Sequence, residues 1–132
     1  RHVAFVSRTA ANILRELGYE ERTVELAAIT GWLHDVGNLI NRVNHGITGA
    51  ALIIPILSNM GMPMHEIVQI AGAIGNHEEQ VGKPISSISA AIIKLTLTGQ
   101  GCAGENTIIT IFMTGLIMRL SRIICLWTVR KG

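Results

Sequence analysis

The sequence predicts an all-α domain, a bundle of about five helices followed by a C-terminal tail of uncertain structure. Apolar residues recur at steps of three and four positions through four successive segments of the first 77 residues, which is typical of amphipathic helices. The alternation typical of strands is absent from the same stretch. The chain has 132 residues, of which 48% are hydrophobic, and this suits one domain with a single core.

The first predicted helix covers about four turns. Its apolar stripe consists of Val3, Val6, Ala10, Ile13, Leu14 and Leu17. Gly18 follows the stripe, and glycine is a typical residue just after the end of a helix. His2 lies one turn before Val6, so we expect its imidazole on the apolar side of this helix.

The second helix is expected over residues 21 to 35, because Val24, Ala27 and Gly31 lead by threes and fours to His34. Gly37 and Asn38 follow as a stop signal. The adjacent pair His34 and Asp35 is therefore expected at the end of this helix, facing the core.

The third helix is expected over residues 45 to 60, with His45 at its start. The predicted apolar face is formed by Gly49, Leu52, Ile53 and Ile56. Gly46 and Gly49 are the small residues nearest His45, and we expect them to leave room for something other than side chains.

Pro63 opens the fourth helix at a first-turn position, where its missing N–H costs nothing. The apolar stripe of this helix consists of Ile67, Ile70, Ala71 and Ile74, and it leads to His77. His65, beside Glu66 on the polar side, is expected at the surface.

Charge and cysteine content exclude several functions. The net charge is +2, and the eleven Lys and Arg residues form no block or stripe, so nothing indicates nucleic-acid binding. Cys102 and Cys125 lie far apart without CxxC spacing, which argues against a disulfide framework or a thiolate zinc site and favours a reduced, cytoplasmic setting.

The chain begins at Arg1 with no signal-peptide pattern, so we expect an excised domain or gene fragment whose first helix begins upstream.

Four of the five histidines thus lie at or near helix ends: His2, His34, His45 and His77. A single histidine on an apolar face is usually a core residue with a satisfied hydrogen bond, and a helical scaffold with an accidental histidine set is one alternative. Asp35, the only aspartate, favours a metal site, because an inward-facing carboxylate is costly unless it is paired or bound to a metal. Imidazole and carboxylate together suit Fe, Mn or Zn.

The ordered series of His, His-Asp, His and His resembles the HD superfamily of metal-dependent phosphohydrolases over roughly residues 1 to 93. The matching segments are Arg1-His2-Val3, Ala27-Ala28-Ile29-Thr30-Gly31-Trp32-Leu33-His34-Asp35-Val36-Gly37-Asn38, Arg42-Val43-Asn44-His45 with Gly49-Ala50, and Ala73-Ile74-Gly75-Asn76-His77-Glu78-Glu79. An isolated His-Asp dipeptide would be a weak signal, whereas the ordered set in its helical context is a strong one.

The resemblance implies an HD-like helical bundle that holds one divalent ion, or two, with Fe, Mn or Zn preferred and Mg also open. By position, His2, His34 and Asp35 would bind the first metal, Asp35 could bridge, and His45 and His77 would hold the second. The implied activity is hydrolysis of a nucleotide or other phosphate ester through a metal-bound hydroxide, with Asp35 and His34 as catalytic residues.

The implied partner is a small phosphorylated substrate. Arg42 and Lys83 are candidates to bind its phosphate oxygens, with solvated surface charges as the equally weighted alternative. Asn76 is a further candidate for substrate contact, and Asn76 or Glu78 could orient metal ligands. The substrate, the identity and number of the ions and the oligomeric state are left open by the sequence.

The sequence departs from the family in lacking a late aspartate ligand. Similar proteins supply a late aspartate ligand after a small apolar run, whereas here the run Ile88, Ala90, Ala91, Ile92 and Ile93 leads into Lys94-Leu95-Thr96. The only later carboxylate is Glu105, in a glycine-rich stretch. We therefore divide the chain into a metal-binding domain, residues 1–94, and a divergent hydrophobic tail, residues 95–132. The alternative function is a catalytically inactive domain with a regulatory or interaction role.

A frameshift would explain the tail. If the tail is translated one nucleotide out of frame, allowed original codons from Ile93 onward encode an Asp-Lys-x-Asp motif and a charged continuation, with no stop forced through Gly132. Sequencing the gene tests this hypothesis. One rival interpretation is an evolved strand or helix that packs on the bundle, and the β-branched residues 107 to 111 locally favour a strand. The other is a membrane span, which is disfavoured because spans need about 20 uninterrupted apolar residues.

Overall fold

A computed structural model describes residues 2–78 and 85–98 of the chain. The elements in chain order are α1 (His2–Glu16), α2 (Glu21–Leu33), the 3₁₀ helix η1 (Val36–Leu39), α3 (His45–Asn59), α4 (Met64–Gly75) and α5 (Ser87–Thr98). The predicted all-α fold class is confirmed, because the described ranges contain helices and no strand. Nearly all of the proposed tail lies outside these ranges.

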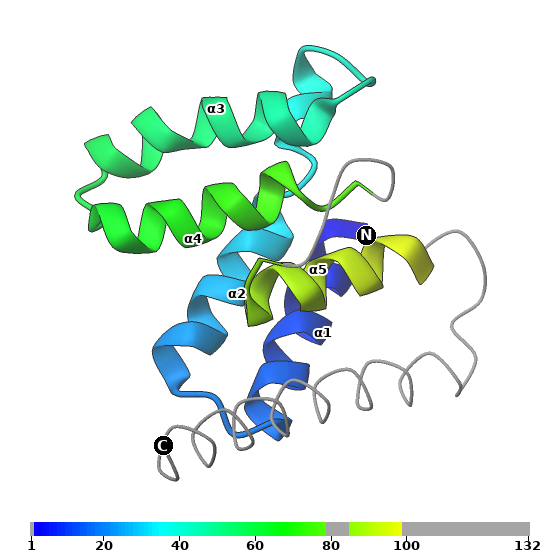
Figure 1. The fold of residues 1–132 in the computed structure, drawn as a ribbon, viewed down its shortest axis with the longest axis vertical. Helices are drawn as coiled ribbons and strands as arrows, with labels where there is room; N and C mark the ends of the chain where they lie inside the picture. Colours follow the sequence, from blue (N-terminus) through cyan, green and yellow to red (C-terminus); the bar gives the residue numbers. More distant parts are fainter. Residues whose placement is uncertain (1, 79–84, 99–132) are drawn as a thin grey trace, which may run out of the picture.

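The bundle consists of two helical hairpins and a fifth helix (Figure 1). Helices α1 and α2 lie side by side, as do α3 and α4, and α2 also packs against α4 and α5. Helix α5 contacts α1, α2 and α4, so it joins the two hairpins. None of the described helices is long and apolar enough to cross a membrane.

The first helix ends where the sequence predicts. Gly18 adopts a left-handed backbone conformation with φ of 75°. Its N–H donates to the carbonyl of Arg15 at 2.9 Å, and the N–H of Tyr19 donates to the carbonyl of Leu14 at 3.0 Å. These two bonds form a Schellman motif, which satisfies carbonyls that have no partner within the helix.

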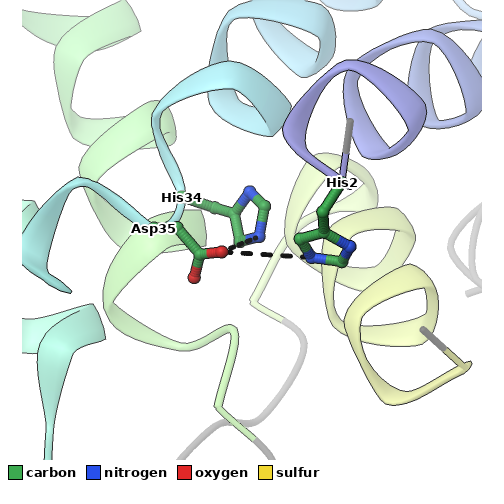
Figure 2. Close-up of side chains that lie close together, drawn as sticks. All are labelled: His2, His34 and Asp35. Carbon is green, nitrogen blue, oxygen red and sulfur yellow. Dashed lines mark ion pairs between the residues drawn. The ribbon is translucent and has the colours of Figure 1, made fainter. Parts of the chain in front are cut away.

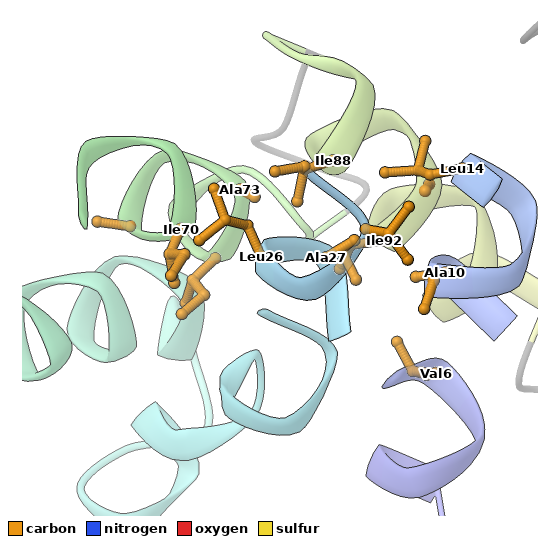
Figure 3. Close-up of a cluster of buried hydrophobic side chains, with 14 of the residues drawn as sticks. Val6, Ala10, Leu14, Leu26, Ala27, Ile70, Ala73, Ile88 and Ile92 are labelled. Carbon is orange, nitrogen blue, oxygen red and sulfur yellow. The ribbon is translucent and has the colours of Figure 1, made fainter. Parts of the chain in front are cut away.

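All five α-helices contribute side chains to the core, part of which Figure 3 shows. Its most buried large side chains include Val6, Leu14, Val24, Ile53, Ile67, Ile70, Ile74, Ile88 and Ile92. The predicted stripe of α4 is confirmed, since Ile67, Ile70, Ala71 and Ile74 are all buried. Full burial of an aliphatic side chain contributes about 1.5 to 3 kcal/mol, so this shared core is the main stabilising term for the bundle.

The predicted face of α3 is partly wrong. Gly49, Ile53 and Leu57 are buried, whereas Leu52 is half-buried and Ile56 is 49% exposed. The reason is the position of α3, which packs mainly on α4 and η1 and therefore buries only a narrow strip.

The structure also corrects the placement of Glu66. His65 is exposed as expected, but Glu66 is only 7% exposed. Arg22 on α2 binds both of its carboxylate oxygens, with Nε to Oε1 at 2.7 Å and Nη2 to Oε2 at 2.5 Å. The hydrogen bonds from Arg22 lower the pKa of Glu66. This bidentate pair fixes α2 against α4.

Helices α1 and α2 approach each other closely at Gly31. A β-carbon at Gly31 would lie 2.5 Å from Cα and 2.6 Å from the backbone nitrogen of Ser7. The Ser7 hydroxyl also donates to the carbonyl of Ala28 at 2.8 Å. Because the neighbouring atoms belong to the backbone, a side chain at position 31 would force the two helices apart.

We therefore expect Gly31→Ala to lower the free energy of unfolding by about 1 to 3 kcal/mol, as in other overpacked interiors. Gly75→Ala is the matched helical control, because its β-carbon would lie 3.6 Å from Cβ of Ala50, an ordinary contact. The free energy of unfolding of this control should be unchanged or higher by up to about 1 kcal/mol, because alanine has a higher helix propensity than glycine. Urea denaturation followed by circular dichroism measures both variants, and equal stability of the two would contradict the close approach.

Candidate metal centre

The predicted ligand residues come together although they lie on different elements. His2 begins α1, His34 and Asp35 follow the last turn of α2, His45 begins α3, and His77 follows α4. Figure 2 shows His2, His34 and Asp35 pointing toward one another from the start of α1 and the end of α2. Short connections between antiparallel helices bring these ends to one part of the bundle.

The ring of His34 is oriented by the end of its own helix. Its Nδ1 lies 2.8 Å from the carbonyl oxygen of Gly31, which is in the last turn of α2 and lacks a partner within the helix. A carbonyl only accepts, so Nδ1 carries the hydrogen and the neutral ring has its lone pair on Nε2. His34 is fully buried, and its Nε2 has no hydrogen-bond partner among the described residues.

His77 and His45 are oriented in the same way. Nδ1 of His77 lies 2.6 Å from the carbonyl oxygen of Ile74, and Nδ1 of His45 lies 3.0 Å from that of Arg42. In each case the acceptor is three residues earlier in the chain, as it is for His34. All three rings therefore use Nδ1 to bind backbone and present Nε2 to the centre.

The three Nε2 atoms converge on Asp35. Oδ2 of Asp35 lies 3.3 Å from Nε2 of His34, and Oδ1 lies 3.1 Å from Nε2 of His45 and 3.8 Å from Nε2 of His77. Nε2 of His45 is also 3.0 Å from Nε2 of His77. His2 completes the set from the rim, with Nε2 at 4.0 Å from Oδ2 and a side chain that is 45% exposed.

These atoms form two groups that could hold a metal ion, one of His2, His34 and Asp35 and one of Asp35, His45 and His77. The ligand atoms within each group lie within 4.8 Å of one another. Around an ion with bond lengths of about 2.0 to 2.2 Å, neighbouring ligand atoms lie about 2.8 to 3.6 Å apart. The five separations given above, 3.0 to 4.0 Å, lie in or near that range, so small side-chain shifts would bring these atoms around an ion.

The electrostatics of the cluster also fit a cation. With Nδ1 protonated, the facing Nε2 atoms of His45 and His77 are both acceptors, and the adjacent carboxylate oxygen is a third. Such a set is repulsive unless a proton or a metal ion lies among the acceptors. Burial lowers the pKa of His77, which disfavours the protonated ring. A hydrogen bond from His34 is the main cause that lowers the pKa of Asp35 to about 2, and it acts when Nε2 of His34 also carries a hydrogen. Because the ordinary carboxyl pKa is 3.8, Asp35 is ionised at neutral pH with either form of the ring.

Of the residues expected to bind substrate, the two that the structure describes, Arg42 and Asn76, do not join the cluster. Arg42 is exposed, and its guanidinium makes no ion pair within the described ranges; its carbonyl instead orients His45. The amide of Asn76 donates to the carbonyl of Gly72 at 2.8 Å, a bond within the end of α4. Lys83 and Glu105 lie outside the described residues. Glu78, in contrast, contacts Nδ1 of His45 with its carboxylate.

The expectation of open space beside His45 is wrong. A β-carbon at Gly46 would lie 2.9 Å from the carbonyl oxygen of Ile74 and 3.2 Å from Nδ1 of His77. The absence of a side chain at Gly46 therefore lets α3 approach α4 until the rings of His45 and His77 meet. The space is filled by backbone and by an imidazole.

Sequence reasoning missed two polar contributors. Asn38 donates its side-chain amide to Oδ1 of Asp35 at 3.3 Å, and its position three residues later in a turn could have indicated this contact. Asn44 adopts a left-handed conformation with φ of 59° directly before His45. Asparagine tolerates this conformation better than most residues, and here it directs the chain into α3.

No protein family model, curated protein or solved structure matches this chain.

Folding stability of the metal-free protein should depend on His77. Burial lowers its pKa in the folded state below the ordinary 6.5, so as the pH falls below 6.5 the unfolded chain takes up the proton first. The free energy of unfolding in EDTA should therefore decrease from pH 7 toward pH 5. His77→Gln should reduce this slope, whatever its effect on stability at pH 7. Identical slopes in urea titrations of both proteins would contradict the assignment.

Metal binding should require Asp35, which faces both ligand groups. We expect purified protein dialysed against Zn²⁺ to retain the ion, and Asp35→Ala to lose it. His65→Ala is the matched control, because it removes an exposed imidazole from the polar side of α4. Elemental analysis per chain measures retention, and equal zinc content in the wild type and Asp35→Ala would contradict a centre built on this carboxylate.

Proposed function

We propose that this chain is a metal-dependent phosphohydrolase of the HD superfamily, acting on a nucleotide or another small phosphate ester. The observation that carries the proposal is the convergence of three Nε2 atoms on the two oxygens of one ionised aspartate. The order of the ligand residues along the chain is the order found in that superfamily. Fe, Mn or Zn suits this set of imidazole and carboxylate ligands.

The residues of the chain have separate roles in this proposal. Asp35 directs Oδ2 toward His34 and His2 and Oδ1 toward His45 and His77, so it can contribute to both groups. The backbone carbonyls that bind Nδ1 of the three buried or half-buried histidines hold each Nε2 in position. A divalent ion at these residues would lower the pKa of a coordinated water toward neutrality and offset negative charge on a phosphate.

A substrate would reach the centre from its exposed side. The side chains of His2 and Asp35 are 45% and 34% exposed, whereas His34 and His77 are almost fully buried. Arg42 is the exposed cation three residues before His45, and we propose that it contacts a phosphate oxygen when substrate is bound. Lys83 and Asn76 remain further candidates for substrate contact.

The alternative is a catalytically inactive HD-type domain with a regulatory or interaction role. One observation favours it: among the described residues, no second carboxylate joins the group of His2, His34 and Asp35. An incomplete set of ligands binds less tightly and selects less well between ions. The two functions predict different results in the same hydrolysis assay.

That assay uses protein loaded with Mn²⁺ or Zn²⁺ and two chromogenic substrates, a phosphodiester and a phosphomonoester. We expect turnover of at least one substrate and a loss of about 100-fold or more in kcat/KM for Asp35→Asn, since such a loss corresponds to about 2.7 kcal/mol of transition-state stabilisation. His65→Gln should retain wild-type activity. Full metal occupancy without turnover would contradict the hydrolase and favour the inactive domain.

A further inference from the structure

The two ligand groups differ in how far their side chains must be ordered before an ion can bind. In the group of Asp35, His45 and His77, the two closest atom pairs are 3.0 and 3.1 Å apart, and the two histidine side chains are only 16% and 4% exposed. In the other group Asp35 lies 3.3 Å from Nε2 of the buried His34, but 4.0 Å from Nε2 of His2, whose side chain is 45% exposed. The main difference between the groups is therefore the exposure of His2. Ordering an exposed side chain costs conformational entropy, and closing a longer gap costs more.

The group of Asp35, His45 and His77 also has a second carboxylate beside one of its histidines, that of Glu78. Glu78 contacts Nδ1 of His45, on the side of the ring opposite the Nε2 that faces Asp35. Its side chain is 19% exposed, so this contact is largely shielded from water. Nδ1 of His34 and Nδ1 of His77 each contact a backbone carbonyl, whereas Nδ1 of His45 contacts both the carbonyl of Arg42 and the carboxylate of Glu78.

A carboxylate in this position has two physical effects. It keeps the hydrogen on Nδ1, which leaves Nε2 free to bind, and its negative charge makes the imidazole a stronger electron donor. The carbonyl of Arg42 also keeps the hydrogen on Nδ1 of His45, but it is neutral, whereas the carboxylate of Glu78 adds a negative charge beside the ring. Glu78 follows His77 directly in sequence, so the residue that orients His45 is fixed to the same turn as the second histidine of the group.

We propose that Glu78 is a positioning residue for His45, and that it makes the group of Asp35, His45 and His77 the first to bind a divalent ion. The group of His2, His34 and Asp35 then binds a second ion more weakly. This inference rests on the metal centre of the proposed function and adds an order of occupation and the residue responsible for it.

The test measures Zn²⁺ binding by equilibrium dialysis with a competing chelator, and it needs no substrate. We expect His2→Ala to keep the affinity for the first equivalent of Zn²⁺ and His45→Ala to lose it. Glu78→Ala should weaken the first equivalent by about 10- to 100-fold, the range found for residues that orient metal-bound histidines. Glu78→Gln should weaken it less, because its amide oxygen still accepts from Nδ1 of His45.

Glu16→Gln is the charge-matched control, since Glu16 is exposed at the far end of α1, about 21 Å along the helix from His2. Denaturation in EDTA checks that every variant is folded. If Glu78→Ala does not fold, Glu78→Gln still tests the role of the carboxylate. Wild-type affinity in both Glu78 variants, or retention of the first equivalent by His45→Ala, would overturn the inference.

The assignment of Glu78 and the proposed function can fail separately. Zinc binding in the expected order without hydrolysis of any phosphate ester would contradict the phosphohydrolase alone. Hydrolysis and zinc binding that do not respond to Glu78 substitution would contradict the positioning role alone. A wild-type chain that binds no Zn²⁺ would overturn both.

Discussion

The arrangement of this bundle depends on one electrostatic constraint, the placement of several imidazole lone pairs around a single ionised carboxylate. Nε2 atoms 3.0 Å apart beside an aspartate oxygen repel one another unless a cation lies between them. Burial lowers the pKa of His77 and so disfavours its protonation, and the same atoms form a group that could hold a metal ion. The core, the helix ends and the connecting turns together hold these groups at short distance.

Backbone carbonyls at the ends of the helices orient the ligand histidines. The last-turn carbonyls of Gly31 and Ile74 accept from the following imidazoles of His34 and His77. The carbonyl of Ile74 also accepts from the backbone N–H of His77 at 3.3 Å. The bond from each Nδ1 turns the opposite Nε2 toward the centre. The missing side chain at Gly46 allows α3 to approach α4, and the Arg22–Glu66 pair fixes α2 against α4. Stability and ligand geometry therefore arise from the same contacts.

The sequence predicts the helices well, because the periodic burial of residues such as Val6, Ile67 and Ile74 depends on local spacing. It also indicates that the histidines meet, since their positions at helix ends restrict where the rings can lie. It does not reveal which strip of α3 is buried or that Glu66 is paired, because both depend on how neighbouring helices are placed. The contact between Glu78 and His45 likewise joins two elements 33 positions apart in the chain. The frameshift origin of the tail stays a prediction.

A crystal structure of the zinc-loaded protein, with anomalous diffraction recorded at the zinc edge, would locate a bound ion in the candidate metal centre. We expect an anomalous peak about 2.0 to 2.2 Å from Oδ1 of Asp35 and from Nε2 of His45 and His77. Clear density for all three side chains at the distances observed here, with no anomalous peak among them, would contradict a metal centre at this site.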